Sequence, residues 1–387
     1  MNHPTEVSMP TPPPIKRPVR FLHIFPEYGR GGAELRVTRT INSMGPGAGH
    51  MVMSISGRME AATTLDRACQ VEVVSGPPKR GPIRFPIDLW KAVRKINPKV
   101  VLTYNWGATD AVLAAKIARF RPVLHNECGL SADVDGKGWR RRWIRRLLLP
   151  GCHRVIVTSH TIRDLALQYY GVSEKQLTFI KTGVDVHRFS PGRSPLVRQK
   201  ITQGDESLVV FGYIGTLRPS KNLPMLLRAF AAANQPNTRL AIFGDGPERE
   251  NLKALAQDLG ISSAVYFHGY VDEPEHAFRA IDVNVTTSRS EAASNSLLEA
   301  MATGLPVITT DIADNQRMLG IDNRAFVYAH EDLAGYTTGL QRMATEFELR
   351  IALGKKNRAH VCTEYPIERM YREYAELWNS AAELARH

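Results

Sequence analysis

Short apolar runs alternate with amphipathic segments along most of the chain, and this alternation restricts the fold more than any other feature. In the first half the expected strands are Val19–Phe25, Met51–Ile55, Val71–Val74, Val100–Tyr104, Val123–His125, Val155–Thr158 and Leu177–Lys181. Helical patterns separate several of these runs, as at Asp88–Ile96 and Ala108–Arg119. Strands that alternate with helices predict a parallel, doubly wound α/β sheet.

A second series of the same kind follows a break between Asp185 and Gly204, which is marked by Pro191, Gly192 and Pro195. Its expected strands are Leu208–Ile214, Leu240–Phe243, Val265–His268, Val283–Thr286, Val307–Thr309 and Phe326–Tyr328, and its expected helices are Pro224–Ala233, Glu248–Leu259 and Ser296–Ala302. The sequence therefore predicts two Rossmann-like domains, at 19–190 and 206–365. A linker at 191–205 joins them, and an amphipathic helix over Ile367–Leu384 closes the chain within 366–387.

Net charge, the composition of the first residues, the length of the apolar runs and the cysteines limit the possible partners and location of the protein. The 387 residues include 50 Lys and Arg against 38 Asp and Glu, a net charge of +12 that favours an anionic partner such as nucleic acid, an acidic membrane or a phosphorylated small molecule. Residues 1–18 are polar and rich in proline, which predicts a disordered tail rather than a signal peptide. No apolar run reaches the ~18 residues of a membrane span. Four scattered cysteines, without metal-ligand spacing, fit reduced thiols, so we expect a cytoplasmic protein.

Two parallel-sheet domains in tandem imply a cleft, because ligands bind beyond the carboxyl ends of such strands. The stretch from Ser290 to Ile308 enters this cleft from a strand and opens a helix at Asn295, Ser296 and Leu297. The N-terminus of a helix favours a diphosphate. Glu291 could accept hydrogen bonds from sugar hydroxyls and Glu299 from a ribose. The alternative is a surface helix with two solvated carboxylates.

This stretch resembles the signature of the retaining glycosyltransferases of family four, which have the GT-B fold. Six further motifs match that family in order: Gly31-Gly32-Ala33-Glu34, Gly49-His50, Thr182-Gly183-Val184-Asp185, Gly215-Thr216-Leu217-Arg218-Pro219-Ser220-Lys221-Asn222, Gly244-Asp245-Gly246-Pro247 and His268-Gly269-Tyr270-Val271. The resemblance implies two Rossmann-like domains facing a central cleft. It also implies a nucleotide-diphosphate sugar as donor, retention of the anomeric configuration, and no metal or other cofactor.

The resemblance assigns roles to particular residues. Arg218 and Lys221 would neutralise the charge that builds on the departing diphosphate. The family commonly places its arginine directly after the glycine, where this sequence has Thr216, so the role passes to Arg218. The remaining expected donor contacts, on backbone or pocket wall, are Gly31, Gly32, Gly215, Gly244, Gly246, Tyr270 and Val271. The alternative for Arg218 and Lys221 is an ordinary exposed basic loop. For Gly31 and Gly32 it is a plain tight turn, and for Tyr270 and Val271 it is ordinary core packing.

The catalytic position in the first domain departs from the family. The run His125-Asn126-Glu127-Cys128-Gly129 stands where family members often have His, x, Glu, His, Gly. With a cysteine in the second histidine position, His125 and Glu127 become the candidates for contact with the sugar, and a structural role is the alternative. Asp133-Val134-Asp135 is an acidic doublet, but it lies in the wrong domain to serve the donor, so no metal site is expected.

Residues 138–149 carry a basic run with tryptophans. On a helix Trp139, Trp143, Ile144 and Leu147 share one side, while Arg140, Arg141 and Arg145 cover much of the rest. Such a helix fits the surface of an anionic membrane and would bring the first domain to a lipid-linked acceptor. The alternative is a core-packed helix with a solvated basic face. Nucleic acid is not expected as a partner, because no recognition motif supports it.

The sequence thus predicts a retaining, metal-independent glycosyltransferase. It would use a nucleotide-sugar donor and a glycan or polyprenyl-linked acceptor, in the synthesis of cell-surface polysaccharide such as exopolysaccharide, at the inner face of the membrane. Two alternatives remain: a non-catalytic member that binds nucleotide sugar or assembles a complex, and a sugar-nucleotide epimerase of the same fold. A phosphorylase of this fold would need a lysine that carries pyridoxal phosphate, and nothing in the sequence marks one.

Overall fold

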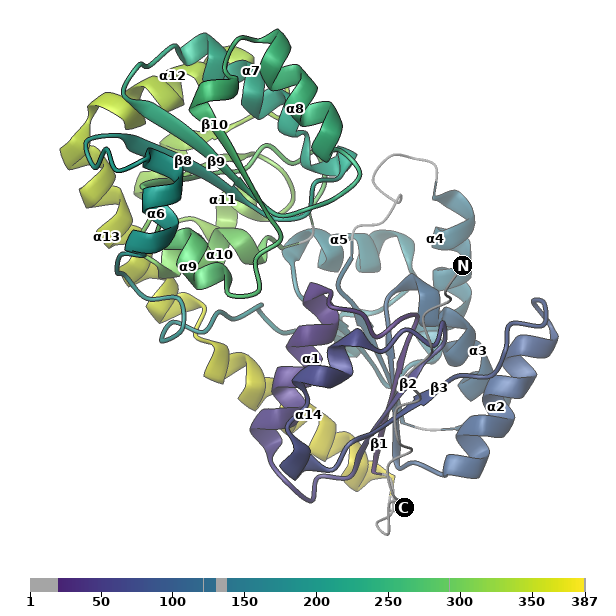
Figure 1. Cartoon of the computed structure of the whole chain (residues 1–387). Helices are drawn as coiled ribbons and strands as arrows, with labels where there is room; N and C mark the ends of the chain where they lie inside the picture. The colour runs from purple at the N-terminus through teal and green to yellow at the C-terminus, as the bar shows by residue number, and fades with distance from the viewer. Residues whose placement is uncertain (1–19, 121, 130–137, 292, 386–387) are drawn as a thin grey trace, which may run out of the picture.

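The computed structural model describes residues 20–120, 122–129, 138–291 and 293–385, which form two α/β domains around two parallel sheets (Figure 1). This arrangement confirms the predicted fold class. The expected tail at 1–18 and the acidic doublet Asp133–Asp135 lie outside the described residues.

The sheet of the first domain has seven parallel strands in the order β3-β2-β1-β4-β5-β6-β7. Each predicted strand is present, with ends within two residues of the expected ones: β1 (Phe21–Phe25), β2 (His50–Ser54), β3 (Glu72–Ser75), β4 (Val100–Tyr104), β5 (Val123–Glu127), β6 (Arg154–Val157) and β7 (Leu177–Phe179). The helices that flank this sheet are α1 (Gly32–Met44), α2 (Arg84–Ile96), α3 (Thr109–Ile117), α4 (Trp139–Leu148) and α5 (His160–Tyr169).

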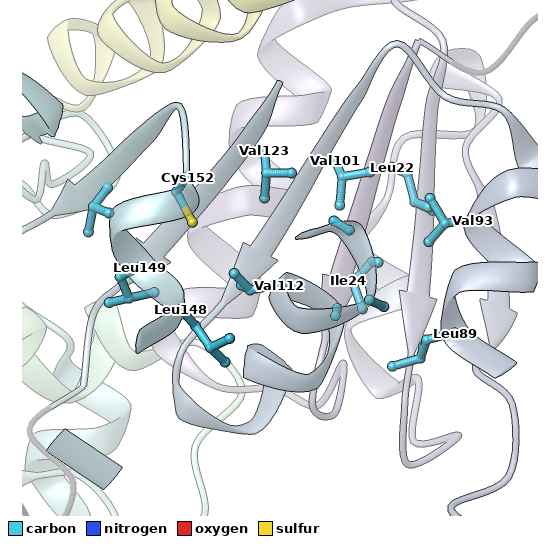
Figure 2. Close-up of a cluster of buried hydrophobic side chains, with 14 of the residues drawn as sticks. Leu22, Ile24, Leu89, Val93, Val101, Val112, Val123, Leu148, Leu149 and Cys152 are labelled. Carbon is cyan, nitrogen blue, oxygen red and sulfur yellow. The ribbon is translucent and has the colours of Figure 1, made fainter. Parts of the chain in front are cut away.

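The core on one face of this sheet explains why its strands are apolar runs without alternation. Figure 2 shows Leu22, Val101 and Val123 on the strands facing Val112 of α3 and Leu148 of α4, and these side chains are at most 9% exposed. The other face packs against α1 and the C-terminal helix, so the strands are buried on both sides.

The second domain holds a six-stranded parallel sheet in the order β10-β9-β8-β11-β12-β13. Its strands again agree with the predicted runs to within two residues: β8 (Val209–Ile214), β9 (Thr238–Phe243), β10 (Val265–Gly269), β11 (Val283–Val285), β12 (Val307–Thr310) and β13 (Val327–Tyr328). The helices are α6 (Pro195–Thr202), α7 (Leu223–Ala233), α8 (Arg249–Asp258), α9 (Pro274–Phe278), α10 (Asn295–Ala302), α11 (Asn315–Met318), α12 (Leu333–Thr345) and α13 (Phe347–Glu364).

The connection expected at 191–205 contains a helix rather than irregular chain. Helix α6 begins with Pro195, whose fixed φ suits the first helical position. Its buried Ile201 packs with Val210 and Phe243 of the second domain. This part of the chain therefore belongs structurally to the second sheet.

The last helix, α14 (Ile367–Leu384), has the predicted bounds but returns to the first domain. Its Trp378 is fully buried against Phe21 of β1, and Figure 1 shows α14 beside α1. The chain thus crosses between the domains twice, and the crossings are paired: Val184 N donates to Tyr365 O at 2.9 Å, and Ile367 N donates to Val184 O at 3.2 Å.

Candidate functional site

Helix α10 opens the site, and it begins at Asn295 as predicted. Ser294 is its N-cap, because the Ser294 hydroxyl accepts a hydrogen bond from Leu297 N at 3.3 Å. The Ser296 hydroxyl donates to Ile214 O at 3.1 Å and ties the first turn to the end of β8. The positive end of α10 is thereby fixed beside the carboxyl edge of the second sheet, where an anion is favoured.

Lys221 and Glu291, both predicted site residues, are in direct contact beside this helix. The Lys221 ammonium donates a hydrogen bond to the Glu291 carboxylate, which also accepts one from the Ser288 hydroxyl at 2.9 Å. The Lys221 side chain is 22% exposed and the Glu291 side chain 16%. A half-buried cation and its carboxylate partner therefore lie next to the opening turn of α10.

The loop that carries Lys221 is held in place by backbone contacts. The Thr287 hydroxyl donates to the carbonyl oxygens of Lys221 and Asn222 at 3.0 and 3.1 Å. Asn222 has a φ of 51°, which asparagine tolerates, and this turns the chain into α7. Arg218 lies on the same loop with an exposed side chain, so the structure places both predicted cations at one strand end.

Gly244 and Gly246 serve a close approach between two loops. A Cβ on Gly244, whose φ is 132°, would lie 1.8 Å from the backbone oxygen of Gly215, and one on Gly246 would lie 2.4 Å from that of Leu217. Only glycine fits there. Gly215, which is also a predicted site residue, therefore belongs to the same pair of closely packed loops. Tyr270 is 60% exposed, which excludes the core-packing alternative for its ring.

The first domain presents the start of α1 to the start of α10. A Cβ on Gly32 would lie 2.8 Å from Nδ2 of Asn295, so the two helix N-termini meet across the cleft. At Gly31 the Glu34 carboxylate folds back over the chain, and a Cβ there would lie 2.2 Å from Glu34 Oε2. Burial raises the pKa of Glu34. The structure thus brings the predicted site residues Gly31, Gly32 and Asn295 together where α1 and α10 begin.

A pocket continues from this junction along α1 and α10. It is lined by polar and charged groups of both domains, among them Arg36, Arg39, Thr182, Asp185, Asn295 and Glu299. Burial raises the pKa of Glu299 to about 7, although Arg39 and Arg188 oppose the shift. A carboxyl group that titrates near neutrality therefore faces the arginines of α1.

The raised pKa of Glu299 predicts a pH-dependent stability. Between pH 4.5 and about 7 the folded chain holds a proton on Glu299 that the unfolded chain has released, so the free energy of unfolding should fall as the pH rises. The full shift corresponds to about 3 kcal/mol, and partial exposure of the side chain reduces the expected loss to about 1–2 kcal/mol. Urea unfolding at pH 5 and pH 8 should show this loss in the wild type and not in Glu299→Gln. An equal pH dependence in both proteins would contradict the assignment.

The structure places His125 and Glu127 away from the cleft surface. Their side chains are 0% and 1% exposed. His125 Nδ1 bonds the Thr103 hydroxyl at 2.8 Å, and Glu127 accepts from Arg145 Nε at 2.8 Å and Nη2 at 3.2 Å. Strand β5 continues two residues beyond its predicted end, so both side chains lie inside the domain. This geometry favours the structural alternative for the pair.

Arg36, Arg145 and Asp314 make contacts that the sequence motifs did not indicate. Arg36, one turn into α1, approaches Cys128 Sγ with Nη1 at 3.8 Å. Burial raises the pKa of Cys128, although Arg36 opposes the shift. Arg145 neutralises Glu127, and Asp314 joins the two domains. The spacing of Gly32, Arg36 and Arg39 on one helical face is the one pattern that could have indicated Arg36.

Two family models match the chain, one in each domain. Residues 30–188 match the model described as Glycosyltransferase Family 4, and residues 198–360 match the model described as Glycosyl transferases group 1.

Curated relatives and solved structures point the same way. The lipopolysaccharide core biosynthesis glycosyltransferase LpsE of Rhizobium meliloti is 30% identical over 147 residues, 38% of this chain and 43% of that protein. The alpha-monoglucosyldiacylglycerol synthase of Streptococcus pneumoniae is 29% identical over 271 residues, 64% of this chain and 54% of that protein. The chain thus spans about half the length of these two relatives or less.

Among solved structures, Anabaena HepE in complex with UDP-glucose has a TM-score of 0.79 and 19% identity, covering 93% of this chain and 99% of that one. This likeness concerns the fold. Since the two family models together match most of the chain, one in each of its two domains, the chain belongs to the glycosyltransferases of the family-four type with the GT-B fold.

Proposed function

We propose that the chain transfers a sugar, with retention and without a metal ion, from a nucleotide-diphosphate sugar to a glycan or lipid-linked acceptor in cell-surface polysaccharide synthesis. One observation carries the proposal: Lys221 and Glu291 are paired beside the N-terminus of α10, opposite the start of α1. The HepE structure with UDP-glucose supports a nucleotide-sugar donor, and the names of LpsE and of the diacylglycerol enzyme support a lipid-linked acceptor.

The second domain would hold the donor. As the bond between the anomeric carbon and the diphosphate oxygen breaks, negative charge grows on the phosphate. Lys221 and the positive end of α10 stabilise that charge more than they stabilise the intact donor. When Lys221 turns from Glu291 to the phosphate, the Glu291 carboxylate becomes free to accept a hydrogen bond from a sugar hydroxyl. Glu299, on the next turn of α10, would accept hydrogen bonds from the ribose.

The first domain would hold the acceptor. Retention would follow from attack on the face that the diphosphate leaves, with a donor phosphate oxygen accepting the proton of the acceptor hydroxyl. No pair of catalytic carboxylates is needed for this route, which agrees with the interior positions of His125 and Glu127.

Turnover of labelled donors tests the proposal. The full chain would be incubated with UDP-, GDP- and ADP-linked sugars and a polyprenyl-diphosphate-linked glycan, with and without EDTA. We expect one donor class to give a product whose anomeric configuration, read by NMR, matches the donor, at an equal rate with EDTA. Saturable donor binding without product would instead indicate the non-catalytic alternative, and a changed free sugar nucleotide would indicate the epimerase.

Helix α4 gives the acceptor side a surface for an anionic membrane. Three of its apolar residues face outward: Trp139, Trp143 and Leu147 are 61%, 58% and 65% exposed. Arg145, expected on the solvated basic side, is instead fully buried against Glu127. The exposed tryptophans favour the membrane surface over the alternative of a core-packed helix with a solvated basic face, although α4 also packs on the core through Leu148.

The charge of the chain is concentrated on the same domain. Residues 20–190 hold 27 Lys and Arg against 13 Asp and Glu, whereas residues 191–387 hold 21 against 24. Within the described part of the chain no helix has the length and hydrophobicity that a bilayer span requires. A basic domain with exposed tryptophans fits peripheral contact with acidic lipid headgroups.

Removal of the apolar face should weaken this contact. The triple variant Trp139→Ser, Trp143→Ser and Leu147→Ser should bind vesicles of equal phosphatidylglycerol and phosphatidylcholine at least about tenfold more weakly, with little change in stability, because all three side chains are exposed. Flotation or surface plasmon resonance measures the binding. The matched control is Ile321→Ser with Phe347→Ser, two exposed apolar residues of the second domain. Equal binding of the triple variant and the wild type would refute the contact.

A further inference from the structure

A carboxylate of the second domain caps a helix of the first. Asp314 follows β12 and accepts three hydrogen bonds at the start of α5: from His160 N at 2.6 Å, from Thr161 N at 3.0 Å and from the Thr161 hydroxyl at 2.8 Å. Asp314 is more than 150 positions away in the sequence from both His160 and Thr161. Both carboxylate oxygens are used, so the contact fixes direction as well as distance.

The setting of Asp314 makes this contact more than a chance surface pair. The residue is 4% exposed, although it is an aspartate at the junction of two domains. A buried carboxylate is costly unless hydrogen bonds replace its water, and here the first amides of α5 do so. The preceding Ala313 has a φ of 47°, a conformation that alanine rarely adopts, and it is held there while Asp314 reaches α5.

The contact lies on the cleft side of both sheets and beside the paired crossings, because Asp314 and His160 line one pocket with Thr182 and Tyr365. Strand β12 ends just before Asp314, and strand β6 ends just before α5. Asp314 thus adds a side-chain contact between the domains to the backbone contacts at the paired crossings. In the same arrangement Gly32 of α1 lies against Asn295 of α10. The Asp314 contact and the Gly32–Asn295 junction thus belong to one relative placement of the domains.

We propose that Asp314 is a positioning residue that fixes the closed placement of the two domains by capping α5, and so holds the start of α1 against the start of α10. The carboxylate acts through domain placement and touches no reacting atom. The effect on sugar transfer rests on the proposed function, whereas the effect on domain placement does not.

Hydrogen exchange on the full chain, without substrate, tests the placement directly. In Asp314→Ala the amides of His160 and Thr161 lose their acceptors, so a peptide over 159–165 should exchange at least tenfold faster. Peptides from β4 and β8 should be unchanged, which separates release of the contact from general destabilisation. Small-angle scattering should show a larger radius of gyration. Thr161→Val, which removes one of the three hydrogen bonds, should give an intermediate change.

Asp311→Ala is the matched control, because Asp311 is an exposed aspartate on the same loop. It should leave exchange at 159–165 and scattering unchanged. With the sugar nucleotide that the chain turns over, Asp314→Ala should lower kcat about tenfold, while the Kd for UDP or the matching nucleoside diphosphate should change less than twofold. Unchanged exchange at 159–165 in Asp314→Ala would overturn the proposal. So would an effect of the same size in Asp311→Ala. If the chain transfers no sugar, the exchange and scattering results still decide the matter.

Discussion

Replacement of Lys221 by alanine should lower kcat for sugar transfer by about 10² to 10³, the cost of removing one donor from a site of developing negative charge. Lys221 is the half-buried cation beside the opening turn of α10, and its Glu291 partner keeps it there before the donor arrives. Because the charge on the diphosphate grows as the bond breaks, the loss should fall on kcat more than on the KM for the donor. Radiolabelled transfer assays give both constants.

Stability should change little in this variant. The pair is partly exposed, and such pairs contribute at most about 1 kcal/mol. Lys253→Ala is the matched control, since Lys253 is also paired to a glutamate, at 2.9 Å, but lies exposed on α8. Lys221→Arg should recover part of the rate, because the charge remains while the geometry changes. Full activity in both Lys221→Ala and Glu291→Gln would remove these residues from the site.

The strands were predictable because parallel strands buried on both faces are continuous apolar runs. Helix α13 was not, and its buried stripe explains why: it consists of Leu353, Gly354, Asn357 and Val361. Gly354 packs on the backbone of Gly304, and the Asn357 amide donates to Leu305 O at 2.8 Å. Because Gly354 and Asn357 stand between Leu353 and Val361 in this stripe, the helix lacks a continuous hydrophobic period, and a pattern of apolar spacing does not reveal it.

The donor side of the site was predictable for a different reason. Asn295, Ser296, Glu291 and Lys221 lie on short segments at the strand ends of one domain, and the fold brings such ends together. The roles assigned to these residues remain predictions. Asp314 and Arg145 could not be found in this way, because each acts on a partner in another element or another domain. His125 and Glu127 lie inside the domain because β5 ends at Glu127, two residues beyond the end that the sequence predicted.

Loss of Arg145 should be the most destabilising single change among the residues discussed. Its guanidinium is fully buried, bonds both oxygens of Glu127 and stacks on Trp106 and Tyr170 at 5.2 and 4.9 Å. Arg145→Met removes both hydrogen bonds between the guanidinium and the buried Glu127 carboxylate, which among the described residues keeps only His125 Nε2 at 3.5 Å, and this loss costs about 3–5 kcal/mol in the free energy of unfolding. Urea unfolding at pH 7 measures this loss. Arg146→Met, an exposed arginine on the same helix, should change stability by less than about 0.5 kcal/mol.

The pH dependence separates the ion pair from simple loss of packing. Burial alone would raise the pKa of Glu127, but His125 and Arg145 outweigh it and the pKa lies below its ordinary value of 4.5. In the wild type the pair therefore contributes stability above pH 4.5 that is lost as the pH falls through the lower folded pKa. Without Arg145 the pKa of Glu127 should rise, so Arg145→Met should lose least stability at acidic pH, where the carboxyl group is protonated. The double variant Arg145→Met with Glu127→Leu should recover most of the lost stability, because both charges are gone. A double variant as unstable as Arg145→Met would show that the stacked guanidinium, and not the charge left on Glu127, accounts for the loss.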